Sequence, residues 1–143
     1  QASKHYAVCV VRNAKYLNWR YSESLLYEMI TLSLRKGGRL YGYLIYYQEE
    51  PDVVQIKVIF YENDDAARHL MGVLISILRR QGVCTVSVGL LGSNPFIEIL
   101  RFFGFSQRAE TSSVIVYPNP SFEYAEMIKD AKNWFMMVGD RDV

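Results

Sequence analysis

The sequence predicts one α/β domain with a mixed, mainly antiparallel central sheet and helices on both faces. Two observations lead to this prediction. Three runs rich in β-branched and aromatic residues follow one another with only short turns between them, as in an antiparallel meander. After these runs, helix-like and strand-like patterns alternate, which is typical of segments that add parallel strands to a sheet.

The meander is predicted from the concentration of Val, Ile, Leu and Tyr in three short runs. Its strands are expected at residues 27–34, 40–47 and 53–60. The first turn contains Gly37 and Gly38, because paired glycines adopt positive φ at little cost, and the second contains Pro51. A Val-rich run at residues 6–11 predicts one more strand before the meander.

A helix of about four turns is predicted after the meander, because apolar residues recur every three or four positions from Ala67 to Leu78. Asp64 and Asp65 can accept hydrogen bonds from the free amides of its first turn, and Gly82 ends it. The remaining elements are a strand at 84–90, a helix from 95 to 104, and strands at 113–117 and 134–138.

Composition excludes several classes of protein. The 143 residues include 16 basic and 15 acidic side chains, so the net charge of +1 gives no reason to expect a nucleic acid or an anionic membrane as partner. No apolar run approaches the length of a membrane span, and no signal-peptide pattern opens the chain. The abrupt start suggests a fragment of a longer protein with a segment missing upstream.

The two cysteines, Cys9 and Cys84, lie in apolar runs and are expected to be buried, reduced thiols in strands. Reduced thiols fit a cytoplasmic protein. His5 and His69 show no metal-ligand spacing with the cysteines, so no metal site is predicted.

The element order and several segments resemble the GNAT superfamily of N-acetyltransferases. The similar segments are KGGRLYGYLIYY at 36–47, NPFIEILRFFGF at 94–105, YLNWRY at 16–21 and WFMMVGDRD at 134–142. The last two resemble a bacterial group of GNAT-like proteins in which this stretch is the C-terminal half. The resemblance implies a single GNAT-like domain over residues 1–143, with an acyl-CoA N-acyltransferase-like fold.

The resemblance also implies where acetyl-CoA or another acyl-CoA would bind. In GNAT enzymes the pyrophosphate lies on a glycine-bearing loop at a helix N-terminus, which is a natural anion site. Here that loop corresponds to residues 61–70, with Asn63, Ala66, Ala67 and Arg68 at the cofactor-binding positions. The loop has no glycine.

Two interpretations of this loop remain open. Asp64 and Asp65 stand where a pyrophosphate would lie, so the loop can be an ordinary capped helix start that repels an anion. Alternatively, Arg68 or His69 holds a phosphate.

Other site residues follow from the same resemblance. The backbone of the central strand at Ile56, Val58 and Phe60 would pair with the pantetheine amides, and Asn94 would lie close to the cofactor. Leu100 stands near the place of the usual tyrosine acid and cannot donate a proton.

A general base is the remaining requirement. Glu62 follows the central strand and is the weak candidate base, with a surface acid as the alternative interpretation. Glu49 and Glu50 fit a solvated hairpin turn better than a base.

The segment Trp19-Arg20-Tyr21 also has two interpretations. It can form a recognition edge through a cation–π contact, or Trp19 and Tyr21 can pack on the meander while Arg20 pairs with Asp140 or Asp142. In the second case the acidic residues close a charged cluster over the sheet.

Three functions are therefore compared. The first is an acyl-CoA-dependent N-acyltransferase acting on an amine. The second is a non-catalytic GNAT-like domain that packs beside an upstream GNAT-like domain or in a homodimer. The third is an isolated binding module, for which no positive feature is present.

Overall fold

The computed structural model describes residues 6–22, 27–91, 94–108 and 114–141. Two compact units are distinguished by their internal contacts. The larger unit comprises Val10–Leu90 and Met137–Val143, and the smaller comprises Gln1–Cys9 and Leu91–Met136.

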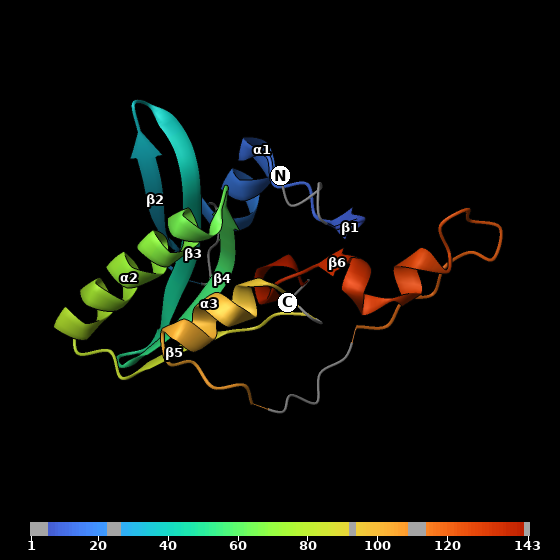
Figure 1. Cartoon of the computed structure of the whole chain (residues 1–143). Coiled ribbons are helices and arrows are strands. Elements are labelled where there is room, and N and C mark those ends of the chain that lie inside the picture. Colours follow the sequence, from blue (N-terminus) through green and yellow to red (C-terminus); the bar gives the residue numbers. More distant parts are fainter. Residues whose placement is uncertain (1–5, 23–26, 92–93, 109–113, 142–143) are drawn as a thin grey trace. The chain divides into compact units, whose positions relative to one another are not determined.

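A four-stranded sheet in the order β2-β3-β4-β5 forms the larger unit (Figure 1). The strands are β2 (Ile30–Lys36), β3 (Arg39–Glu50), β4 (Val53–Tyr61) and β5 (Thr85–Val88). The first three strands pair antiparallel, and β5 joins β4 in parallel. Gly37 and Gly38 have φ values of 57° and 79°, as the predicted turn requires. The sheet is therefore mixed and mainly antiparallel, which confirms the predicted fold class.

Helical segments cover both faces of this sheet. The long helix α2 (Asp64–Arg80) packs on one face (Figure 1), where Gly42 admits it. A Cβ added at Gly42 would lie 2.8 Å from Leu70 Cδ1 and 2.8 Å from the Phe60 carbonyl oxygen. On the other face, Tyr21 of the helical segment η2 (Asn18–Ser22) joins a core with Tyr43, Ile45 and Val58. The short helix α1 (Ala14–Leu17) precedes η2.

The smaller unit contains little regular structure. Strands β1 (Val8–Cys9) and β6 (Trp134–Phe135) pair in parallel. Its helical segments are α3 (Phe96–Phe102), η3 (Met127–Lys129) and η4 (Ala131–Asn133). Trp134 Nε1 donates to the Ile128 carbonyl at 2.9 Å, which ties β6 to the end of η3.

Three predicted strands are wrong in extent or existence. The run at 6–11 forms only β1, and the run at 134–138 forms only β6 with a bridge at Met137. Of the run at 113–117, the described residues 114–117 form no strand, and Ile115 and Tyr117 are 90% and 94% exposed. Strand propensity is realised only when a neighbouring strand and a buried face are available.

The cysteine prediction is also corrected. Cys84 is exposed and lies just before β5, and Cys9 is only half-buried. Neither thiol belongs to a fully buried strand.

Candidate functional site

The candidate site is the edge of β4 beyond the point where β5 stops pairing with it. The parallel pairing joins Val53–Ile56 to Thr85–Val88, whereas β4 continues to Tyr61. Lys57 is an extra residue at a bulge, because Tyr46 opposes Ile56 while Ile45 opposes Val58. A bulge bends its strand and increases the local twist. The second half of β4 therefore meets groups other than β5.

Ile59 directs both of its backbone hydrogen-bonding groups to this edge. Its N–H donates to Met137 Sδ at 3.2 Å, and its carbonyl accepts from Arg12 Nη1 at 3.4 Å. A thioether is a weak acceptor, and 3.4 Å is long for an N–H···O bond. Two weak contacts thus occupy a donor and an acceptor that two successive amides of an extended chain could satisfy better.

Besides Arg12, the residues that meet this edge belong to the segment Met137–Arg141, which we call the closing segment. It contains the short turn η5 (Val138–Asp140). Val138 N–H donates to the Gly89 carbonyl at 3.0 Å, and Met137 forms a bridge with Leu90 just after β5. A Cβ added at Gly139 would lie 2.6 Å from the Lys57 carbonyl oxygen. The closing segment therefore contacts both parallel strands where they separate.

A buried ion pair anchors the closing segment. Arg12 Nε and Nη2 donate to Asp140 Oδ1 at 3.2 Å and Oδ2 at 2.5 Å, a bidentate arrangement. The side chains of Arg12 and Asp140 are 9% and 0% exposed. Asp140 Oδ2 also accepts from the Met137 N–H at 2.9 Å, so the same carboxylate holds the backbone of Met137 in place.

The YLNWRY segment supplies a second anchor. Tyr21 Oη donates to the Gly139 carbonyl at 2.9 Å. Arg20 Nε donates to the same carbonyl at 3.4 Å, and Arg20 Nη2 donates to the Arg141 carbonyl.

These contacts revise the sequence-based interpretation. Tyr21 packs on the meander as predicted, but Trp19 is 60% exposed, with its ring centroid 6.0 Å from that of Tyr16. Arg20 binds backbone carbonyls, and Arg12 takes the predicted place of Arg20 beside Asp140. Asp142 lies outside the described residues.

The hydroxyl of Tyr21 makes alkaline stability a test of this anchor. Burial, and then the charge of Asp140, raise the pKa of Tyr21 above its ordinary value of 10.0. The folded state therefore keeps a proton that the unfolded chain releases, so this contribution is complete below about pH 10 and is lost above it.

We expect Tyr21→Phe to remove this dependence and to make the loss of stability above about pH 10 shallower by up to about 1.4 kcal/mol per pH unit. Urea unfolding at a series of alkaline pH values measures the slope. Tyr124→Phe, at a half-exposed ring, is the matched control and should follow the wild type. Parallel curves for all three proteins would contradict a protected Tyr21 proton.

The predicted phosphate loop is a capped helix start. Asn63 is the N-cap of α2, and its Oδ1 accepts from the Ala66 N–H at 2.9 Å. Asp64 and Asp65 occupy the first turn, where carboxylates are favoured by the helix dipole. The cap is thus one residue earlier than predicted. Ala66 and Ala67 are buried and Arg68 is exposed.

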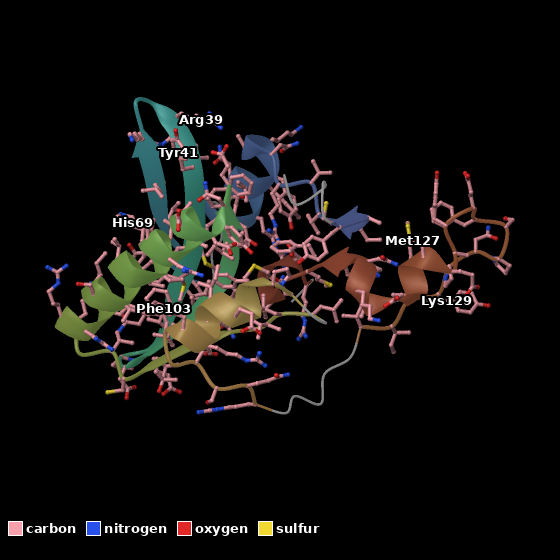
Figure 2. The ribbon with its side chains drawn as sticks, viewed as in Figure 1. Arg39, Tyr41, His69, Phe103, Met127 and Lys129 are labelled. Carbon is pink, nitrogen blue, oxygen red and sulfur yellow. The ribbon has the colours of Figure 1, made fainter. Side chains whose placement is uncertain are left out.

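Glu62 lies between the end of β4 and α2, as predicted. Its Oε1 pairs with Arg39 Nη2, and the guanidinium of Arg39 also lies over the Tyr41 ring, 5.2 Å from its centroid. Figure 2 shows Arg39 and Tyr41 at the start of β3. The role of Glu62 as a general base stays a prediction. Glu49 and Glu50 end β3 in exposed positions, as expected for a solvated hairpin.

The smaller unit holds Asn94 and Leu100. The Asn94 side chain is 3% exposed, and its Oδ1 accepts from the Phe96 N–H at 2.9 Å. Its Nδ2 has no hydrogen-bond partner among the described residues. Leu100 is a buried residue of α3. The predicted link of Asn94 to a cofactor stays a prediction.

Sequence reasoning missed four residues at this edge: Arg12, Lys57, Ile59 and Met137. The Lys57 ammonium lies over the Tyr47 ring at 4.8 Å, and burial lowers the pKa of Lys57. The only signal in the sequence was a lysine in the middle of a predicted inner strand. Arg12 and Met137 carry no local signal, because their partners are distant in the chain.

The described residues contain neither a candidate metal-ion site nor a candidate membrane-spanning helix. No group of three or more His, Cys, Asp or Glu side chains is placed to hold a metal ion in the part of the chain that the structure describes. Within the same residues, no helix is both long and apolar enough to cross a membrane.

Comparison with known proteins finds a likeness among solved structures. No family model matches the chain, and no curated protein matches it. A ribosomal-protein-alanine N-acetyltransferase from Brucella melitensis biovar Abortus 2308 is similar in structure, with 21% identity, a TM-score of 0.42, and coverage of 62% of this chain and 70% of that one. Such a distant likeness assigns neither a family nor an activity.

Proposed function

We propose that this domain is an N-acyltransferase of the GNAT type that binds an acyl-CoA along β4 and transfers the acyl group to an amine. The observation that supports the proposal is the separation of β4 from β5 after Ile56, with the donor and acceptor of Ile59 directed to the resulting edge. The pantetheine arm of CoA contains two amides, and an extended amide chain binds a free strand edge through its backbone.

The binding residues in this proposal differ in part from those expected first. Hydrogen-bonding groups alternate between the two sides of a strand. Since Ile59 directs its groups to the open edge, Val58 and Phe60 direct theirs to Ile45 and Tyr43 of β3. Ile59 therefore becomes the main backbone contact, and Ile56 marks the point where β5 leaves.

The phosphate end of the ligand contributes little in this proposal. Asn63 already accepts from the Ala66 N–H in the first turn of α2, and Asp64 and Asp65 place two negative charges where the pyrophosphate of a GNAT ligand would lie. Affinity then comes from the pantetheine arm and the acyl group.

The test is calorimetric titration of the full chain with acetyl-CoA and with S-acetylpantetheine. Both are expected to bind with similar, weak affinity, at a Kd of up to about 1 mM or roughly −4 kcal/mol. The double variant Asp64→Asn/Asp65→Asn should bind acetyl-CoA about fivefold more tightly and S-acetylpantetheine with unchanged affinity, because only the first ligand carries the pyrophosphate.

A charge-matched control is available in the smaller unit. Glu98→Gln/Glu126→Gln removes the same two charges at side chains that are 75% and 86% exposed. It should leave both affinities unchanged. If neither ligand binds any of these proteins, the acyltransferase proposal is wrong.

A second candidate function is a non-catalytic GNAT-like domain. The observation that favours it is the closing segment, which occupies the edge of β4 with a buried ion pair and a tyrosine hydrogen bond. Absence of acetyl-CoA binding in the titration would support this candidate. An upstream GNAT-like domain or a second copy of the chain as partner, and a cytoplasmic location, stay predictions in either case.

A further inference from the structure

Met137 is the part of the closing segment that covers the Ile59 amide. Its side chain is 1% exposed, and its Sδ accepts from the Ile59 N–H. A buried backbone N–H usually finds an oxygen acceptor. A thioether in this position satisfies the amide only weakly.

The closing segment is firmly anchored through Asp140 and its backbone, whereas its contact with Ile59 is weak. Asp140 and Gly139 receive the bonds of Arg12 and Tyr21, all of which depend on side chains outside β4. Against Ile59, the described residues place the thioether of Met137 at the N–H and the long contact from Arg12 at the carbonyl. The carbonyl of a ligand amide can therefore replace the thioether at the Ile59 N–H while the anchors remain in place.

Methionine suits such an exchange. Its unbranched side chain has three rotatable bonds and adapts to irregular space, so it can leave one position and pack in another at low cost. A branched residue at position 137 would not have this freedom.

We infer that Met137 is a removable internal plug: its thioether takes the place of a ligand amide at Ile59, and β4 accepts an amide ligand only when this side chain moves away. The acyl-CoA identity of the ligand rests on the proposed function, but the plug itself does not. The plug makes the wild-type domain a weak binder whose affinity is limited by the cost of displacing Met137.

The experiment uses two probes and two variants of the full chain. Met137→Ala removes the plug. Met71→Ala removes a methionine that is equally buried in α2, away from the edge, and controls for loss of core packing. N-methylacetamide is a minimal amide that tests the edge without CoA, read from the NMR signal of the Ile59 N–H. Acetyl-CoA tests the proposed ligand by calorimetry.

We expect N-methylacetamide to shift the Ile59 signal in Met137→Ala but not in the wild type or in Met71→Ala. Acetyl-CoA should bind Met137→Ala at least about tenfold more tightly than the other two proteins. Thermal melts verify that both variants are folded and lose comparable stability.

The other outcomes distinguish the Met137 plug from the proposed acyl-CoA ligand. A shift with N-methylacetamide in Met137→Ala alone, with no acetyl-CoA binding in any protein, supports the plug and rejects the proposed ligand. An unchanged Ile59 signal in Met137→Ala, or equal responses in the wild type and Met137→Ala, overturns the plug. Equal acetyl-CoA affinity in all three proteins also overturns it, while leaving acyl-CoA binding intact.

Discussion

Asp140→Asn is expected to lower the free energy of unfolding by about 3–5 kcal/mol, because it breaks a buried ion pair and leaves the other charge without its partner. Asp140 is fully buried and accepts from two Arg12 nitrogens and from the Met137 N–H. An amide has a single acceptor oxygen, and its NH₂ group would face the guanidinium of Arg12. Urea unfolding followed by circular dichroism measures the change, and the melting temperature should fall by about 10 °C.

The control is another arginine–carboxylate ion pair, on the surface. Glu98 pairs with Arg101 within α3, and both side chains are more than half exposed. Glu98→Gln should change stability by less than about 0.5 kcal/mol, because exposed pairs are solvated in both states.

A double variant tests whether Asp140 acts through Arg12. Arg12→Gln/Asp140→Asn should lose much less stability than the sum of the two single variants, because no uncompensated charge remains. Additive losses, or an Asp140→Asn variant as stable as Glu98→Gln, would show that the buried pair does not anchor the closing segment.

The meander and α2 could be predicted from the sequence because local patterns determine them. The Gly37-Gly38 turn and the apolar period from Ala67 to Leu78 involve residues that are neighbours in the chain. The boundaries were less accurate. β2 begins at Ile30 rather than at residue 27, and Asn63 caps α2 where Asp64 was expected.

The closing segment could not be predicted because its contacts join the two ends of the chain. Arg12 and Asp140 are separated by 128 positions, and Met137 and Ile59 by 78. No periodicity reports such a pairing. The sequence suggested a charged cluster that involves Asp140. Either Arg12 or Arg20 could have filled the place beside this carboxylate, and only the fold selects Arg12.

The outline of the candidate site could be predicted from the order of the elements. The order of strands placed the central strand and the following helix, so the positions of Ile56, Glu62 and Asn63 followed. The bulge at Lys57 decides which backbone groups reach the open edge, and a one-residue change reverses that choice. Nothing in the strand pattern marked the bulge, and Ile59 was therefore missed as a backbone contact.

Gly139→Ala tests the packing of the closing segment against β4, and we expect it to destabilise the domain by about 3 kcal/mol. The added Cβ would lie 2.5 Å from Tyr21 Oη and 2.6 Å from the Lys57 carbonyl oxygen. A backbone carbonyl in the central strand cannot move aside, so the closing segment must shift and weaken the bonds that Tyr21 and Arg20 make to the Gly139 carbonyl. Urea unfolding of the variant measures the loss.

A double-mutant cycle with Tyr21→Phe separates the two close contacts. Removing the Tyr21 hydroxyl relieves the clash at 2.5 Å but leaves the one at the Lys57 carbonyl. The combined loss should therefore be smaller than the sum of the single losses by about 1 kcal/mol, without falling to that of Tyr21→Phe alone. Wild-type stability in Gly139→Ala would mean that the closing segment does not pack on β4, and Met137 could then not cover the Ile59 amide.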